Sequence, residues 1–451
     1  MTHRFRMSKR YLGCVLPLAI VAVALIPGTA AGQVHPAVAN VPSCVNSRTL
    51  SGSVNFADLH RAQTLLAHRD RWAGQLSDFD MGARQKTAEP TDLKTFLDFA
   101  AAAGRGWTAE EKNNWQTVVD GLSDAMKGLN LHLSNIDLIK TSGEEELGAA
   151  GYTRRNAIIL SESIISLPVT DSRRAHFLLA HELFHVLSGR DSRLRDDLYA
   201  LLGFRTVDGF EYPAELEDRR VSNPDSFEYR HILTVQSGSE SVDVLPVFQS
   251  LLPLEEAIQL PFFFDALDIV LLSIDAGTGE ALRDGNGDLI KYNFGNTNWV
   301  PLMLRNSSFI IQPEEVLADN FATLMEWRSD GVLAPQNPDG FPANDVDLLV
   351  ALEGVLTSGC AAAIVPRTDI TVASERYIVT PSHEKKAGTR APKPAVASPS
   401  KAVWRSKSTG TEDDDLGDAT SDRAPGVRRV AARRGRRYGW ERVQSSAAGC
   451  M

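Results

Sequence analysis

The chain has no long apolar run, few cysteines and no excess of basic residues, and each lack excludes a class of protein. None of its uncharged apolar stretches reaches the roughly 18–20 residues that cross a bilayer, which excludes a multipass membrane protein. Four cysteines in 451 residues, with no CxxC pair, exclude a disulfide-dense scaffold and a zinc knuckle. The formal net charge of −10 argues against nucleic acid as a partner. A hydrophobic content of 43% is ample for a packed core.

The first 31 residues have the pattern of a secretory signal peptide. Residues 1–10 carry four basic side chains and no acidic one, an apolar run follows from Leu12 to Ile26, and small residues gather at 29–32. A basic start, a short apolar middle and a small-residue exit are typical of a cleaved export signal. We therefore expect residues 1–31 to be removed and the protein to be secreted or periplasmic, with an uncleaved anchor as the alternative.

The composition changes again towards the C-terminus and indicates where the folded part ends. Residues 381–451 hold 15 Lys and Arg against 8 Asp and Glu, and few aliphatic side chains. Such a segment cannot bury enough surface to offset its ordering entropy, so we expect a disordered basic tail after a single domain over residues 32–380. In an oxidising compartment Cys44 and Cys360 can form a disulfide, with two free thiols as the alternative.

Hydrophobic periodicity predicts an α+β fold with a β-rich insertion. Apolar residues recur at helical spacing in six segments, which are 56–75, 92–103, 108–128, 173–188, 192–202 and 313–327. Strands are expected at 131–139 and 156–165. Residues 205–300 have mostly strand and loop character, with turn signals such as Asp208-Gly209.

One short motif carries the strongest chemical signal. Residues 178–187 are apolar except for His181, Glu182 and His185. Positions i and i+4 share a face of a helix, so the two imidazoles can bind one metal ion. Glu182 then lies beside the ion, where it can take a proton from an activated water. The alternative is a pair of buried helix histidines with polar partners.

A catalytic zinc site needs a third protein ligand. No histidine follows His185 at a short distance, and the best candidate lies in the expected helix at 313–327. Glu315 and Asp319 share a face of that helix, so Glu315 can ligate the ion while Asp319 accepts a hydrogen bond from a ligating histidine. Glu314 has no acidic residue four positions on and is kept as the alternative ligand. Without a metal, these acids would complement the helix dipole.

The segments His181-Glu182-x-x-His185 and Glu315-x-x-x-Asp319, with an alanine before the aspartate, resemble the gluzincin zinc metallopeptidases. The resemblance implies a zincin-like fold, in which a mixed sheet with a cleft-lining edge strand packs on the active-site helix. It implies Zn²⁺ bound by His181, His185 and Glu315, with Glu182 as general base and Asp319 as the partner of a ligand. Because 130 residues separate His185 from Glu315, the insertion must lie between the two ligand helices.

Two further features of the substrate site are expected. The edge strand is placed at Tyr152–Ile165, whose apolar part 156–160 precedes the motif helix, and a peptide can pair with such an edge. An interior strand is the alternative. Hydrolysis also builds negative charge on the carbonyl oxygen, which requires a donor. Tyr229 and His231, on either side of Arg230, are the candidate donors, although a lone histidine in a strand is more often structural.

Together these features predict a secreted zinc-dependent peptidase that hydrolyses peptide or protein substrates. A zinc-activated water would attack the peptide bond, with Glu182 as the general base. The alternative is a non-catalytic, zinc-stabilised secreted binding protein. Glu182 favours the peptidase, because a structural zinc site closes its fourth position and needs no base.

Overall fold

A computed structural model of the chain describes residues 49–358, with the exception of 132 and 134. The expected signal peptide at 1–31, the Cys44–Cys360 disulfide and the tail at 381–451 lie outside these residues. Within the described part, no helix is both long enough and apolar enough to cross a membrane.

The N-terminal half of the described chain builds a five-stranded mixed sheet. Its strands are β1 (Val54–Phe56), β2 (Gly104–Arg105), β3 (Ile136–Thr141), β4 (Gly151–Arg154) and β5 (Ala157–Ser161). The order is β1-β3-β5-β4, with β2 paired to β3. β1, β3 and β5 are parallel, whereas β2 and β4 run antiparallel to their neighbours. β4 is therefore an antiparallel edge strand.

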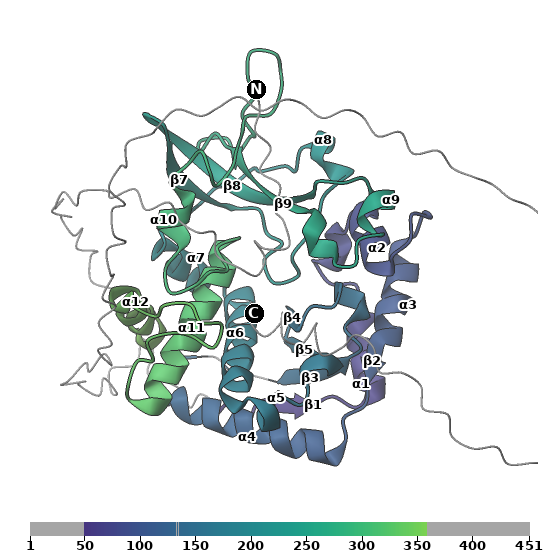
Figure 1. The fold of residues 1–451 in the computed structure, drawn as a ribbon, viewed down its shortest axis with the longest axis vertical. Coiled ribbons are helices and arrows are strands. Elements are labelled where there is room, and N and C mark those ends of the chain that lie inside the picture. The colour runs from purple at the N-terminus through teal and green to yellow at the C-terminus, as the bar shows by residue number, and fades with distance from the viewer. Residues whose placement is uncertain (1–48, 132, 134, 359–451) are drawn as a thin grey trace, which may run out of the picture. The chain divides into compact units, whose positions relative to one another are not determined.

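A second sheet follows between the two helices that carry the motif residues. Its strands are β6 (Arg205–Thr206), β7 (His231–Ser237), β8 (Glu240–Ser250), β9 (Leu267–Ser273) and β10 (Lys291–Tyr292). They pair in the order β10-β9-β8-β7-β6, and every pairing is antiparallel. The expected strand and loop character of residues 205–300 thus corresponds to a sheet, drawn in the upper part of Figure 1.

The described residues also form twelve α-helices. They are α1 (Leu59–Leu66), α2 (Asp78–Gln85), α3 (Leu93–Ala103), α4 (Ala109–Ala125), α5 (Leu167–Thr170), α6 (Ser172–Arg190), α7 (Ser192–Ala200), α8 (Ala214–Glu217), α9 (Leu254–Ala257), α10 (Trp299–Met303), α11 (Pro313–Asp330) and α12 (Val346–Thr357). The largest hydrophobic core is shared by α4, α6, α11 and α12 with strands β3 and β5. Figure 1 shows α6 and α11 side by side within this group.

The ends of the main helices follow from local sequence. Thr108 and Glu111 form a capping box at the start of α4, in which the Thr108 hydroxyl accepts from the Glu111 amide at 3.2 Å and the Glu111 carboxylate accepts from the Thr108 amide at 2.7 Å. Pro313 occupies the first turn of α11, where its missing N–H costs nothing. Gly331 ends α11 with a φ of +72°, a conformation that favours glycine.

Three sequence expectations need correction. The helix expected at 56–75 is limited to α1 and a short 3-10 helix at Ala73–Gln75, and Phe56 belongs to β1, where it pairs with Leu138. The strand expected at 131–139 begins at Ile136, where its partner strands begin to pair. The segment 156–160 lies in β5, between β3 and β4, so the edge is formed by β4 instead. These boundaries are decided by pairing with strands that are distant in the chain, and local periodicity carries no information about such pairing.

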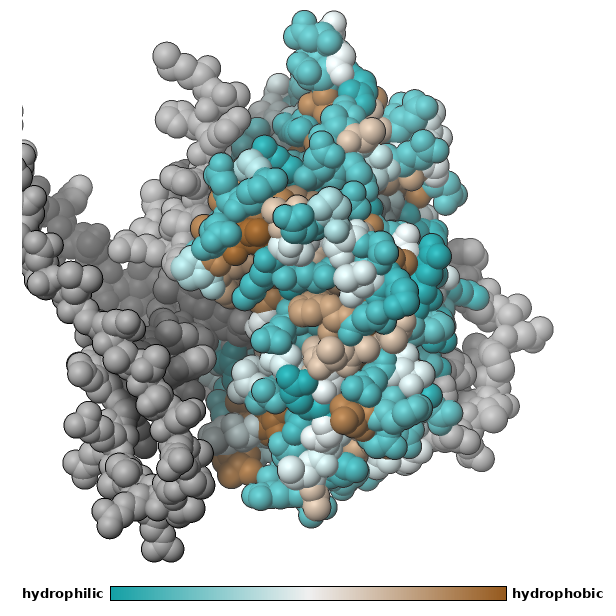
Figure 2. Space-filling view, turned by 90° about the vertical axis from the view of Figure 1, so that its right-hand side faces the viewer, coloured by the Kyte–Doolittle hydropathy of each residue, from teal (hydrophilic) through white to brown (hydrophobic). Residues whose placement is uncertain are grey.

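The face drawn in Figure 2 is mainly hydrophilic where the structure describes it, with apolar side chains in small, separate groups. The exposed large apolar side chains are scattered along the described chain. They include Leu59, Val169, Phe262, Phe309 and Val350. Single apolar residues scattered over a surface are normal and indicate no docking site.

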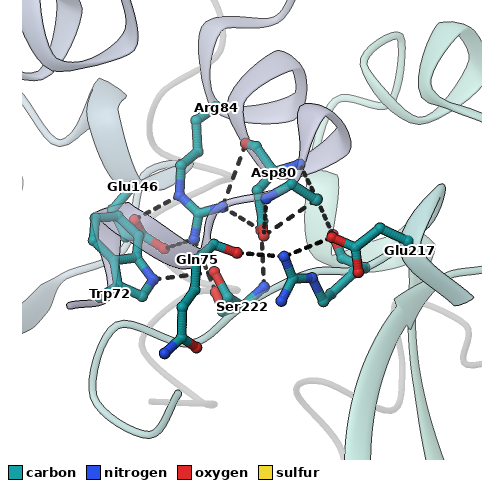
Figure 3. A network of polar contacts seen from close by, with 9 residues as sticks. Trp72, Gln75, Asp80, Arg84, Glu146, Glu217 and Ser222 are labelled. Carbon is teal, nitrogen blue, oxygen red and sulfur yellow. Dashed lines mark hydrogen bonds and ion pairs between the residues drawn. The ribbon is translucent and has the colours of Figure 1, made fainter. Parts of the chain in front are cut away.

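A buried ionic network joins α2 to the insertion (Figure 3). Arg84 donates to the Glu146 carboxylate through Nε at 2.8 Å and Nη2 at 2.6 Å, and to Asp80 Oδ1 through Nη1 at 2.9 Å. Arg84 Nη2 also donates to the Ser222 carbonyl at 2.9 Å, and the Ser222 amide donates to Asp80 at 2.8 Å. Trp72 Nε1 donates to the Ser222 hydroxyl at 3.0 Å. The network therefore holds Ser222 in place.

We expect Arg84→Met to lower the free energy of unfolding by about 3–5 kcal/mol, because it leaves the Asp80 and Glu146 carboxylates buried without a cation. Lys94→Met is the control, since Lys94 and Asp98 form an exposed ion pair whose loss changes stability little. Urea denaturation of both variants measures the difference. Equal losses in the two variants would contradict a structural role for the buried network.

Candidate metal centre

The two motif histidines lie on one face of α6, four residues apart. Their ring centroids are 4.8 Å apart and the rings are nearly perpendicular, at 82°. The Asp171 side chain begins the helix by accepting from the Arg174 amide at 3.0 Å. Most of the apolar side chains between residues 177 and 187 are buried. Burial of the helix on both sides of the pair holds His181 and His185 in fixed positions.

Glu315 of α11 faces both imidazoles. Its Oε2 atom lies 3.3 Å from His181 Nε2 and 3.7 Å from His185 Nε2. The three residues each offer a ligand atom within 4.8 Å of the others and form a group that could hold a metal ion. Ligand atoms around a tetrahedral zinc are about 3.3–3.6 Å apart, given bonds of about 2.0–2.2 Å. The two distances from Glu315 are close to this spacing.

Two carboxylates orient the histidines from the opposite side. His181 Nδ1 lies 2.9 Å from Asp319 Oδ1, and the Ser307 hydroxyl donates to Asp319 Oδ2 at 2.5 Å. His185 Nδ1 lies 2.9 Å from Glu314 Oε1. Because a carboxylate accepts, each Nδ1 carries a proton, and in the neutral imidazole the lone pair then lies on Nε2. This is the arrangement that a metal ligand requires.

Glu314, the alternative third ligand, has a different position from Glu315. It is buried and binds the Nδ1 side of His185, away from the Nε2 atoms. Its Oε2 also accepts from the Tyr199 hydroxyl at 2.5 Å, and the Ser188 hydroxyl donates to its Oε1. Glu314 and Glu315 are adjacent in α11, and they contact different nitrogens of the His185 ring, Nδ1 and Nε2 respectively. The sequence offered Glu314 only as the alternative metal ligand, and its contact with His185 was not predicted because His185 lies on another helix.

Glu182 lies beside the two histidines and is buried. Its Oε2 atom has no hydrogen-bond partner within the described residues. Strand β4 passes directly over this side chain, since a Cβ placed on Gly151 would lie only 2.5 Å from Glu182 Oε1. The absence of a side chain at residue 151 therefore allows the edge strand and Glu182 to meet. Nothing in the local sequence pattern indicated this role for Gly151.

The insertion contributes two residues that the sequence analysis missed. Asn223 Nδ2 donates to Glu315 Oε1 at 2.5 Å. Asp225 forms a second group of possible ligands with Glu182 and His185, again within 4.8 Å of one another. The only local signal is the turn-forming sequence Asn-Pro-Asp, which predicts a loop but not its destination.

The electrostatics of the centre show an excess of carboxylates. Burial, together with the nearby charge of Asp225, raises the pKa of Glu182 to about 8. Burial also raises the pKa of Asp225 to about 6. Burial alone would lower the pKa of His185, but the charges of Asp225 and Glu315 outweigh it and raise that pKa to about 9. Burial opposes ionisation of Glu315, yet the two histidines hold its pKa below the usual value. A cation would relieve this crowding of negative charge.

The two candidate donors of the insertion have other partners. His231 Nε2 lies 2.7 Å from Asp196 Oδ1, and its ring packs on Tyr199 at 4.5 Å. Tyr229 packs on Tyr212 at 5.3 Å, within an aromatic cluster of the second sheet. Among the described residues, neither has a hydrogen bond or ring contact with the metal-binding group. Their role as transition-state donors therefore remains a prediction from the sequence, without a contact to support it.

Tyr199→Phe removes the hydroxyl that donates to Glu314. We expect the free energy of unfolding to fall by about 1–3 kcal/mol, because a buried carboxylate oxygen loses a donor. Tyr292→Phe is the matched control, since the Tyr292 side chain is half-buried and its hydroxyl has no partner in residues 49–358 as described. Urea denaturation measures both, and an equal effect in the two variants would contradict the role of this hydrogen bond.

The geometry of the centre is the basis for its interpretation, since comparison of the chain with protein families, with curated proteins and with solved structures finds no match.

Proposed function

We propose that this protein is a secreted zinc-dependent peptidase of zincin-like fold. The observation that carries the proposal is the convergence of His181, His185 and Glu315, with the unpartnered carboxylate of Glu182 beside them. Two histidines and one carboxylate are a common ligand set of catalytic zinc, which leaves a fourth position for water. Secretion rests on the signal-like sequence of residues 1–31 alone.

The arrangement of the first sheet supports the zincin-like part of the proposal. An antiparallel edge strand, β4, lies against the middle of the histidine-bearing helix α6. An extended peptide could add to this edge through main-chain hydrogen bonds, which would place its carbonyl groups next to Glu182. The resemblance to gluzincins rests on the same residues, with Asp319 in contact with a histidine as that resemblance implies.

The chain's own residues account for the remaining chemistry. A zinc ion, when bound, supplies a Lewis acid that brings the pKa of water towards 7 and polarises a carbonyl group. Glu182 takes the proton from the attacking water and passes it to the leaving amine, so no covalent intermediate is needed. Asp319 and Glu314 keep the two imidazoles in the tautomer that leaves Nε2 free.

The second candidate function is a zinc-stabilised binding protein without catalysis. The observation in its favour is the position of Asp225, close enough to Glu182 and His185 to supply a further ligand. A site with four protein ligands is typical of structural zinc. Against it stands Glu182, whose buried carboxylate has no structural partner in the described part of the chain.

Zinc content tests the ligand set. We expect about one zinc per full-length chain by elemental analysis, as required for a single mononuclear centre. Glu315→Gln should lose most of this zinc, because it removes a ligand charge. Glu314→Gln should retain zinc with an affinity lower by about 10–100-fold, because it only weakens the orientation of His185. Chains without zinc after metal add-back would overturn the proposal.

Glu182→Gln separates the two candidate functions. The variant should keep its zinc and lose about 10²–10⁴-fold in hydrolysis of a protein substrate such as casein, because the proton acceptor is gone. The binding protein would be favoured if the unmodified protein contained the expected zinc but hydrolysed no member of a random peptide library.

Gly151→Ala tests the contact between the edge strand and Glu182. The added methyl group would collide with the carboxylate, so we expect zinc content to persist and kcat to fall by about 10²-fold, as for a reacting group moved by about 1 Å. Gly189→Ala, on the same helix as Glu182, has open space around it and should leave activity unchanged. A fully active Gly151→Ala variant would show that β4 does not confine the base.

A further inference from the structure

A segment of the insertion, residues 222–226, runs past the candidate metal centre and is attached at both ends. At one end, Ser222 is held by the buried network around Arg84 (Figure 3). At the other end, the carbonyl of Ser226 accepts from Gln312 Nε2 at 3.1 Å, next to the start of α11. We call these five residues the crossing segment. It is anchored both to the N-terminal part of the described chain and to the region where α11 begins.

The middle of the crossing segment links α11 to the edge strand β4. Asn223 donates to Glu315 Oε1 at 2.5 Å, and the Asp225 amide donates to Asn223 Oδ1 at 3.0 Å. Asp225 Oδ1 then accepts two hydrogen bonds from Thr153 of β4, one from its amide at 2.7 Å and one from its hydroxyl at 2.6 Å. The segment therefore holds the Asp225 carboxylate against the edge of the first sheet.

Asp225 occupies a main-chain donor of that edge. The Ser161 amide donates to the Ala150 carbonyl at 2.9 Å, and the same antiparallel register continues through β4 and β5. In an antiparallel pair every second residue exchanges hydrogen bonds with the neighbouring strand, so Gly151 and Thr153 face away from β5. The amide of Thr153 is already bound to Asp225. A peptide that adds to this edge has only Gly151 left of these two positions.

Asp225 also lies close to the residue that would act as the base. It offers an oxygen within 4.8 Å of a ligand atom on Glu182 and of one on His185. Both hydrogen bonds that it accepts go to Oδ1, and no described residue donates to its Oδ2 atom. The Oε2 atom of Glu182 is buried and likewise has no partner within residues 49–358 as described. Two neighbouring carboxylates with unused oxygens favour a ligand group that is positively charged and rich in N–H donors.

We propose that Asp225 binds the free α-amino group of a peptide substrate, which makes the protein an aminopeptidase. The inference rests on the proposed function, because it requires hydrolysis at the same centre. A substrate that pairs at Gly151 and ends before Thr153 presents its terminal amine to the unused oxygen of Asp225. An ammonium group donates to that oxygen, whereas a terminal carboxylate would be repelled by it. The charge of Asp225 therefore selects the amino end of a peptide over its carboxyl end.

The lengths involved fit a single residue between Asp225 and the reacting carbonyl group. Within one residue, the amino nitrogen lies about 2.5 Å from the carbonyl carbon. A hydrogen bond of about 2.7–3.0 Å then places the acceptor about 5 Å from that carbon. Asp225 lies within 4.8 Å of Glu182, which would activate the water that attacks the same carbon. A chain that continued beyond this residue would need the Thr153 amide, which Asp225 occupies.

The reaction would release one amino acid at a time from the amino end. Water supplies the hydroxyl group of the new carboxyl group, and the bond between the first carbonyl carbon and the following nitrogen breaks. The proton that Glu182 takes from the water passes to that nitrogen, as in the proposed mechanism. No other reactant is needed. Asp225 takes no part in the proton transfer and only holds the substrate.

The test uses the full-length, zinc-loaded chain and two kinds of probe. A random peptide mixture without lysine is incubated before and after N-acetylation, and mass spectrometry identifies the products. Alanine hydroxamic acid and its N-acetyl derivative, which differ only at the amino group, are titrated by calorimetry and report binding without hydrolysis. The variants are Asp225→Asn, which removes the charge, and Thr153→Val, which removes one of its two tethers. Asp284→Asn is the matched control, because it makes the same change in a turn whose contacts are confined to residues 284–288.

We expect the free peptides to lose single residues from the amino end and the acetylated peptides to stay intact. Alanine hydroxamic acid should bind at least about tenfold more tightly than its N-acetyl derivative, because only the free amine makes a charge-assisted hydrogen bond. Asp225→Asn should keep its zinc, lose most of this preference and raise KM by about 10–100-fold. Thr153→Val should act in the same direction by a smaller factor, and Asp284→Asn should match the unmodified protein.

The outcomes that would overturn the inference are distinguishable from failure of the proposed function. If acetylated peptides are cut at internal bonds, or Asp225→Asn keeps the full preference for the free amine, Asp225 does not bind the amino end, while the proposed peptidase stands. If the unmodified chain holds no zinc or cuts neither mixture, the proposed function fails and the inference fails with it. Circular dichroism shows whether each variant is folded, and Thr153→Val carries the test if Asp225→Asn is not.

Discussion

The packing of α6 on α11 is the interaction on which the candidate centre depends. The two helices are in contact, and α11 contributes fully buried residues such as Ala318 and Ala322 to the main core. Phe184 and Phe321 pack across the contact with ring centroids 5.8 Å apart. This contact brings Glu315 to two histidines that precede it by more than 120 residues. Because apolar burial fixes the helices, the charged residues need not hold them together.

The charged residues of the centre have divided tasks. Asp319 and Glu314 bind the Nδ1 atoms, so the lone pair of each neutral imidazole lies on Nε2. Glu315 faces the Nε2 atoms, and Glu182 stands beside them without a partner within the described residues. Carboxylates so close together in a buried site repel one another unless a cation lies between them. The arrangement is therefore better suited to holding a metal ion than to stabilising the fold.

The insertion connects the centre to the rest of the molecule. Ser222 lies in the network of Arg84, Asp80 and Glu146, three buried residues from the N-terminal part of the chain. Three residues further on, Asp225 reaches the centre. The ionic network around Arg84 thus anchors the chain three residues before Asp225.

The sequence by itself determined the helical placement of His181, Glu182 and His185, because an i, i+4 spacing within an apolar segment specifies both helix and shared face. It also predicted that Glu315 and Asp319 lie on one helix face towards the histidines, since their spacing follows the same rule. The strand-rich character of residues 205–300 was likewise predicted. Only the tertiary structure decided that β4 forms the edge, that Glu314 binds His185, and that Asp225 and Gly151 lie at the centre. These relations join residues far apart in the chain, and long-range packing, which local periodicity does not encode, brings them into contact.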